Sequence, residues 1–241
     1  MRMIFAFTER RSDSPFVERI WRADSVNSGD FLSVAASHWE MVVSKLNGQT
    51  TLTVRGPETK VTPMQCLAGG EWFGIRFKLG TIMPHLPGSQ LVNHGITLPL
   101  TTGEAGKSFW LNGSAWQFPE FENADTFVAW LEHDGLLAHE PVVEAAMRGQ
   151  LNAQSLRTVQ RRFVRATGLT HATVRQIERA RKATLLLREG TPIPDVIRDA
   201  GYFDQPHLHR SLMRFIGQTP VQLLRDRSTQ LSFLYKTESD L

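Results

Sequence analysis

The chain contains very little cysteine and no long hydrophobic run. Cys66 is the one cysteine among 241 residues, so neither an intramolecular disulfide nor a cysteine-rich metal site can form, and we expect a small core residue there. No apolar run approaches the roughly 18 residues that a membrane helix needs. Charged residues follow the short apolar start too soon for a signal peptide. These absences favour a bacterial-type cytoplasmic protein with no membrane partner.

Motifs for catalysis and metal binding are also scarce. We find no Gly-rich phosphate loop, no nucleophile motif and no convincing pair of carboxylates, so we predict no catalytic residue and no cofactor. His38 and Glu40 share one side of a predicted strand, and with His85 and His94 they suggest a metal-binding β-barrel. The tight His-x-His pair with a following acid that such barrels usually carry is missing, so we predict no metal.

The net charge of +3 conceals an uneven distribution. Residues 1–140 hold 11 Lys and Arg against 15 Asp and Glu, whereas residues 141–227 hold 15 against 7. Lys182 is the one lysine of this basic segment, so arginine carries nearly all of its positive charge. Arginine binds phosphate and guanine edges with a planar, two-pronged set of donors. The segment suggests a nucleic-acid partner, with a solvated basic face as an equal alternative on charge alone.

The first 135 residues have the pattern of a strand-rich fold. Residues 38–55 are rich in β-branched and aromatic residues around Asn47-Gly48, a strong signal for a tight turn. Residues 72–80 alternate apolar and polar, as a half-buried strand does. Frequent Gly and Pro favour many short connections, so we predict a β-barrel or sandwich that ends in a helix over 124–133.

The second part is predicted to be entirely helical. Its helices are bounded by Gly, Thr, Pro or Asp and are expected over 142–148, 155–167, 171–189, 192–200 and 205–216. Thr170 is the expected N-cap of the long third helix. We expect its buried stripe to contain Val174, Ile177, Leu185 and Leu186.

An internal repeat relates two of these helices. When the chain is shifted by 49 residues, residues 160–170 align with 209–219 in the pattern apolar-x-Arg-x-apolar-x-Arg-x-x-Gly-x-Thr. The apolar positions are four apart, so they share one helix face, while the arginines occupy another. Two such helices on a rigid connector could enter successive major grooves about 34 Å apart. A 19-residue helical connector spans about 28 Å, which is the right order of magnitude for that separation.

These residues resemble the C-terminal DNA-binding region of AraC/XylS-type transcription regulators. SLRTVQRRF at 155–163 matches the first reading helix of that family almost throughout, and RARKATLLL from Arg179 is close to its linker helix. Residues 193–220 follow the spacing of the second unit. The chain departs from the pattern at Ala153, where the first turn usually has glycine, and at Pro206 and His207. The resemblance implies two helix-turn-helix units joined by a long linker helix and sequence-specific binding of double-stranded DNA.

The resemblance also implies which side chains meet DNA. The base-contacting candidates are Arg157, Gln160, Arg161, His207 and Arg210, because Arg and Gln can pair with guanine and adenine edges. The phosphate-contacting candidates are Thr158, Arg162, Arg165, Gln205 and Arg214. For Arg214, capping the helix end is an open alternative. We expect a buried core at Val159, Phe163, Val196, Ile197, Tyr202, Leu208, Leu212 and Phe215.

The resulting prediction is an α+β transcription regulator in three parts. Residues 1–135 would form a sensing or dimerising β domain, 136–227 the DNA-binding domain and 228–241 a tail. The aromatic residues of the first part fill a core or line a pocket for a small-molecule effector. RNA polymerase is a candidate partner, and the expected oligomeric state is a monomer or a homodimer. The alternative is a metal- or sugar-binding β-barrel enzyme with an attached DNA-binding domain.

Overall fold

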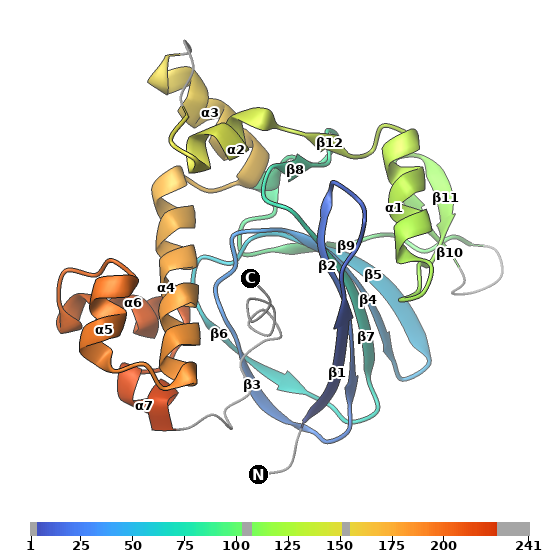
Figure 1. The fold of residues 1–241 in the computed structure, drawn as a ribbon. Coiled ribbons are helices and arrows are strands. Elements are labelled where there is room, and N and C mark those ends of the chain that lie inside the picture. Colours follow the sequence, from blue (N-terminus) through green and yellow to red (C-terminus); the bar gives the residue numbers. More distant parts are fainter. Residues whose placement is uncertain (1–3, 103–107, 151–154, 226–241) are drawn as a thin grey trace.

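The computed structural model describes residues 4–102, 108–150 and 155–225, and Figure 1 shows a strand-rich first part followed by helices. The strands are β1 Phe5–Arg10, β2 Val17–Ser25, β3 Gly29–Ser33, β4 Glu40–Leu46, β5 Gln49–Arg55, β6 Thr62–Cys66, β7 Glu71–Phe77, β8 Thr81–Ile82, β9 Gly95–Thr97, β10 Ser108–Leu111, β11 Ser114–Gln117 and β12 Ala138–His139. The helices are α1 Ala124–His133, α2 Pro141–Met147, α3 Leu156–Thr167, α4 His171–Glu189, α5 Ile193–Asp199, α6 Gln205–Phe215 and α7 Pro220–Arg225, and a 3₁₀ turn, η1, covers Gly88–Gln90.

The main sheet has six strands in the order β1-β2-β7-β4-β5-β9, all antiparallel to their neighbours. The predicted hairpin is confirmed, since β4 and β5 pair from Glu40↔Arg55 to Leu46↔Gln49. Asn47 and Gly48 have φ of 51° and 76°, which a two-residue turn of this kind requires. The alternation in the sequence thus places one face of this sheet on a core that contains Ile20, Leu52 and Phe77.

The prediction of a barrel is wrong in one respect, because the described strands do not close into a cylinder. Strands β3 and β6 pair only with each other and form a separate two-stranded ribbon. Strands β1 and β9 stand at the two ends of the main sheet. Strands β8 and β12 form another pair, and β10 and β11 a further one, so the described strands are divided among four sheets.

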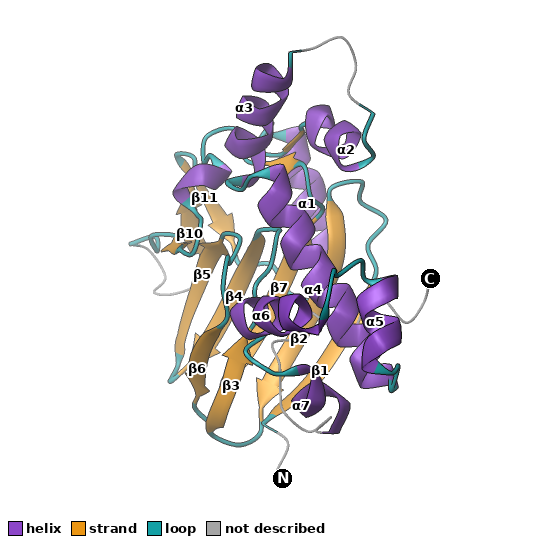
Figure 2. Cartoon of the chain, turned by 90° about the vertical axis from the view of Figure 1, so that its left-hand side faces the viewer, coloured by secondary structure: helices purple, strands orange, loops and turns teal. Residues whose placement is uncertain are grey.

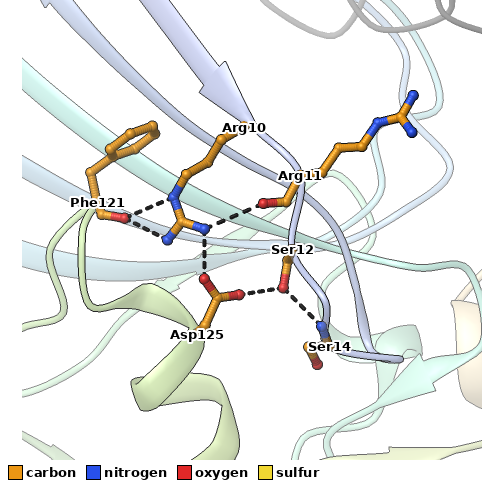
Figure 3. A network of polar contacts seen from close by, with 6 residues as sticks. All are labelled: Arg10, Arg11, Ser12, Ser14, Phe121 and Asp125. Carbon is orange, nitrogen blue, oxygen red and sulfur yellow. Dashed lines mark hydrogen bonds and ion pairs between the residues drawn. The ribbon is translucent and has the colours of Figure 1, made fainter.

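Helix α1 lies against the strands at the position predicted from the sequence. Phe127, Val128 and Leu131 of this helix are buried in the core of the main sheet. At its N-terminal end Asp125 accepts a hydrogen bond from Arg10 and one from Ser12, and Arg10 also donates to the Phe121 carbonyl (Figure 3). Burial alone would raise the pKa of Asp125, but these hydrogen bonds and the charge of Arg10 hold it below its usual value.

The helical part packs against α4 and shares a core with the first part of the chain. Helix α4 runs between α3 at its N-terminal end and α5 to α7 farther along (Figures 1 and 2). Val34, Ala35 and Ala36, which follow β3, belong to the same apolar cluster as the helices. The Ala35 amide donates to the Phe215 carbonyl at 2.8 Å, and the Val61 amide to the Arg214 carbonyl at 3.0 Å. These contacts fix α6 against the strand-rich part.

The core of the helical part closely follows the sequence prediction. Seven of the eight expected core residues are buried, and Ile197 is half-buried. In α4 Val174 and Ile177 are buried as expected, but Leu185 and Leu186 are half-buried and Leu187 is fully buried. The position of Ala153 and the proposed tail 228–241 lie outside the described residues.

Candidate DNA-binding surface

Helix α3 begins and ends with local signals that its sequence carries. Ser155 is the N-cap, and its side chain accepts a hydrogen bond from the Thr158 amide at 3.3 Å. Gly168 follows the helix with φ of 75°, a conformation in which a side chain is strained. Val159 and Phe163 are buried, which turns the opposite face of the helix outward.

The outward face of α3 carries most of the candidates from the first unit. Arg157, Gln160, Arg161 and Arg165 are exposed, and Thr158 is half-buried. Arg157 and Arg161 are four residues apart, so both lie on the N-terminal half of the helix and on one side of it. This arrangement offers two guanidinium groups and one amide to a partner in solution.

Arg162 differs from its neighbours because its half-buried side chain forms an ion pair with another residue of the protein. Its Nε lies 3.2 Å from one carboxylate oxygen of Glu140 and its Nη2 lies 2.6 Å from the other. Glu140 is in turn the N-cap of α2, since it also accepts from the Val142 amide. The ion pair therefore joins the start of α2 to the middle of α3. The assignment of Arg162 to phosphate stays a prediction, and any phosphate would have to compete with Glu140.

Helix α6 is positioned by the turn that precedes it. Asp204 is its N-cap and accepts from the His207 amide at 2.7 Å. Tyr202 is buried, with its hydroxyl 2.9 Å from the Ser211 hydroxyl, and burial raises its pKa. The His207 ring meets the Tyr202 ring edge to face at 5.1 Å, and its Nδ1 lies 3.5 Å from the Phe203 amide. His207 is thus half-buried and held by the turn.

The remaining candidates on α6 are accessible. Gln205 lies at the first turn of the helix, and Arg210 follows on its exposed face. Arg214 lies in the last turn with its guanidinium 5.0 Å from the Phe215 ring, at the end that contacts the strand-rich part. Phe203 is 90% exposed beside the start of the helix, an outward aromatic that the sequence analysis did not single out.

Helix α4 connects the two candidate DNA-binding helices, α3 and α6. It has 19 residues, and Thr170 caps it by accepting from the Thr173 amide at 3.1 Å. The turn between α5 and α6 is tied to its middle: Arg179 lies over the Tyr202 ring at 5.6 Å, and Lys182 donates to the Asp199 carbonyl at 2.8 Å. In Figure 2, α3 and α6 lie at different heights along α4. The rigid helix thus sets their separation.

Comparison with known families agrees with this geometry. A family model described as a helix-turn-helix domain matches residues 152–226, the segment that contains α3 to α7. Residues 152–226 form an AraC-type helix-turn-helix domain. This domain supports DNA binding and transcription regulation of the AraC type, with DNA as a partner. No curated protein and no solved structure matches the chain.

The described part of the chain also bears on metal binding and on membrane spanning. His38, His85 and His94 are not gathered there into any group of three side chains suited to a metal ion. None of the helices described is both long and apolar enough to cross a membrane. Sequence reasoning missed the pairing of Arg162 with Glu140, because the two residues are 22 positions apart and Glu140 precedes α2 whereas Arg162 lies on α3.

Proposed function

We propose that this regulator reads DNA with α3 and α6, which would enter adjacent major grooves on one face of the duplex. Base contacts are assigned to Arg157, Gln160, Arg161, His207 and Arg210. Phosphate contacts are assigned to Thr158, Arg162, Arg165, Gln205 and Arg214. Residues 136–227 would act as the DNA-binding domain, and residues 1–135 would sense a small-molecule effector or hold two copies of the chain together.

The observation that carries the proposal is the outward face of α3. Three candidate residues that can bond base edges, Arg157, Gln160 and Arg161, are exposed in succession on a helix whose other face is buried. Guanidinium groups crowded on one helix repel one another unless an anion lies opposite. The DNA backbone supplies that anion, and base edges add sequence preference.

Two substitutions on α3 separate base reading from phosphate binding. Arg157→Ala should weaken binding to the preferred duplex by about 1–3 kcal/mol and relax the preference at one or two base pairs. Arg165→Ala should weaken binding to all duplexes alike and flatten the salt dependence. Fluorescence anisotropy at fixed salt, with the selected duplex and a scrambled one, measures both. Equal losses on the two duplexes for Arg157→Ala would show that this residue reads no base.

Selection of bound fragments from genomic DNA supplies the preferred duplex and tests the two-helix arrangement. Two reading helices on one chain predict a site with two short blocks of preferred sequence separated by about one helical turn. A monomer would select one such pair of blocks, whereas a homodimer would select it twice. A single short block would contradict the insertion of both helices.

A further inference from the structure

The strand-rich part contains a cavity with aromatic and charged side chains in its wall. It has a volume of about 170 Å³ and is lined by residues of the main sheet and of the β3–β6 ribbon. Phe5 meets Phe31 edge to face at 5.3 Å and Trp72 at 6.0 Å, and all three line the cavity. A cavity of about 150 Å³ with apolar walls accommodates one benzene molecule. The space therefore fits a single ring.

Two polar side chains in the wall of this cavity are buried without complete hydrogen bonding. Arg76 of β7 is 2% exposed and His38 is 5% exposed. The Arg76 Nε and the His38 Nε2 have no hydrogen-bond partner among the described residues. A buried guanidinium that keeps an unpaired donor is costly, so the group calls for a partner such as a water, an ion or a ligand. Both residues line the cavity.

The two carboxylates that line the cavity, Glu40 and Glu58, are already engaged with other side chains. Glu58 accepts from Arg55 at 2.6 Å and from Ser33 at 2.9 Å. Glu40 accepts from the Trp21 indole at 3.2 Å and lies 3.9 Å from Arg55. Glu18 lies 3.9 Å from the His38 Nδ1, and its charge acts on Arg76 as that of Glu40 does. Within the described part of the chain the Arg76 Nε and the His38 Nε2 still lack an acceptor, and a negatively charged acceptor forms the stronger hydrogen bond with a guanidinium.

We infer that the cavity binds a small aromatic carboxylate, with its ring among Phe5, Phe31 and Trp72 and its carboxylate on Arg76 and His38. This ligand class deepens the proposed sensing role of residues 1–135 and rests on it. Benzoate, phenylacetate and 3-phenylpropionate are simple members of the class.

One segment carries both the cavity wall and the contacts to the DNA-binding helices. Between residues 33 and 40 the side chains of Ala36, His38 and Glu40 line the cavity. Two other residues of the segment contact the helices: the Ala35 amide donates to the Phe215 carbonyl at the end of α6, and the Ser37 hydroxyl donates to Glu178 of α4 at 2.5 Å. A ligand that moves or steadies this segment therefore acts on α4 and α6 directly.

Arg181 of α4 strengthens the connection between the cavity and the helix. It is 4% exposed and pairs with Glu178 at 3.4 Å. Burial lowers the pKa of Arg76; Glu18 and Glu40 oppose this effect, and the charge of Arg181 lowers the pKa further. An anion on Arg76 relieves the repulsion between the two buried guanidinium groups, so it stabilises the packing of α4 against the strands.

The test uses the full chain without DNA and compares each acid with its amide, which has the same shape and no charge. Isothermal titration, with tryptophan fluorescence as a second readout, should show that at least one acid binds about tenfold or more tightly than its amide, as hydrogen bonds to a charged group imply. If no acid of the three binds better than its amide up to about 10 mM, the inference is wrong. This comparison needs no variant.

Substitutions then locate the site. Arg76→Gln should remove the preference for the acid, whereas the matched control Arg22→Gln should keep it, because Arg22 lies on β2 with its side chain 48% exposed and outside the cavity wall. Preference retained in Arg76→Gln would place the ligand elsewhere. If Arg76→Gln does not fold, His38→Gln, which removes the second ligand contact, takes its place with the same two outcomes.

The DNA readout is kept separate from ligand binding. The acid should change the affinity of the unaltered chain for the selected duplex, and Ser37→Ala should reduce this change while the acid still binds. An acid that binds without altering DNA affinity would refute the coupling through residues 33–40. A chain that binds the acid but no specific duplex would refute the proposed reading of DNA and leave the ligand site intact.

Discussion

The ion pair between α2 and α3 leads to a prediction about stability that concerns no DNA. Arg162→Ala removes two hydrogen bonds to Glu140, whose side chain is 16% exposed, while that of Arg162 is 36% exposed. Hydrogen bonds to charged groups are worth about 1.5–3 kcal/mol when buried, and exposed ion pairs about 0.2–1 kcal/mol. The half-buried pair lies between these limits. We expect Arg162→Ala to lower the free energy of unfolding by about 1–2 kcal/mol.

Chemical denaturation followed by circular dichroism measures this loss, and the neighbouring residue supplies a matched control. Arg161→Ala makes the same change of residue type on the same helix at an exposed position. It should alter the free energy of unfolding by less than about 0.5 kcal/mol. A double-mutant cycle with Glu140→Gln should give a coupling energy of about 1 kcal/mol. Equal losses for Arg161→Ala and Arg162→Ala, or a coupling near zero, would refute the reasoning.

Two further predictions concern backbone strain and pH. Gly168→Ala should destabilise the protein by more than about 1 kcal/mol, because φ is 75° and the added Cβ would lie 2.5 Å from the Gly88 carbonyl oxygen. Gly149→Ala shares a positive φ but meets nothing within 4 Å, so thermal denaturation should show a smaller loss there, and equal losses would show that the contact with Gly88 contributes nothing. Burial holds the pKa of His38 well below 6.5, and the charges of Arg76 and Arg181 lower it further. His38 therefore takes up a proton less readily in the folded state than in the unfolded state. The stability that the neutral imidazole contributes is fully present above pH 6.5 and is lost as the pH falls from there toward the folded-state pKa. His38→Gln should flatten this part of the stability curve measured by urea denaturation between about pH 7 and pH 5, and an unchanged slope would assign the loss to other groups.

Much of the candidate DNA-binding surface could be predicted from the sequence, because its signals are local. Helix caps at Ser155 and Thr170 act within three residues, and the structure places both as N-caps. The burial of Val159 and Phe163 follows from their spacing of four, which puts them on one helix face. Once that face is buried, the exposure of Arg157 and Arg161 follows from helix geometry alone.

The less predictable features depend on contacts between distant parts of the chain. The sequence predicted strands correctly at β4, β5 and β7, but not that the β3–β6 ribbon would remain separate from the main sheet. Pairing between strands that are remote in the sequence depends on which strand edges the fold brings together, and residue type carries little information about this choice. The half-burial of His207 likewise depends on Tyr202 being buried beneath it.

By itself, the amino-acid sequence determined the helical segments, their caps, the arginine-bearing repeat and thereby the AraC-type DNA-binding domain, because each depends on residues within a few turns of one helix. Only the tertiary structure decided which of those arginines are available. It paired Arg162 with Glu140 and left Arg157 exposed. It also assembled the cavity around Arg76 and joined its wall to α4 and α6, since these groups become neighbours only when strands β1 to β7 and these two helices pack together.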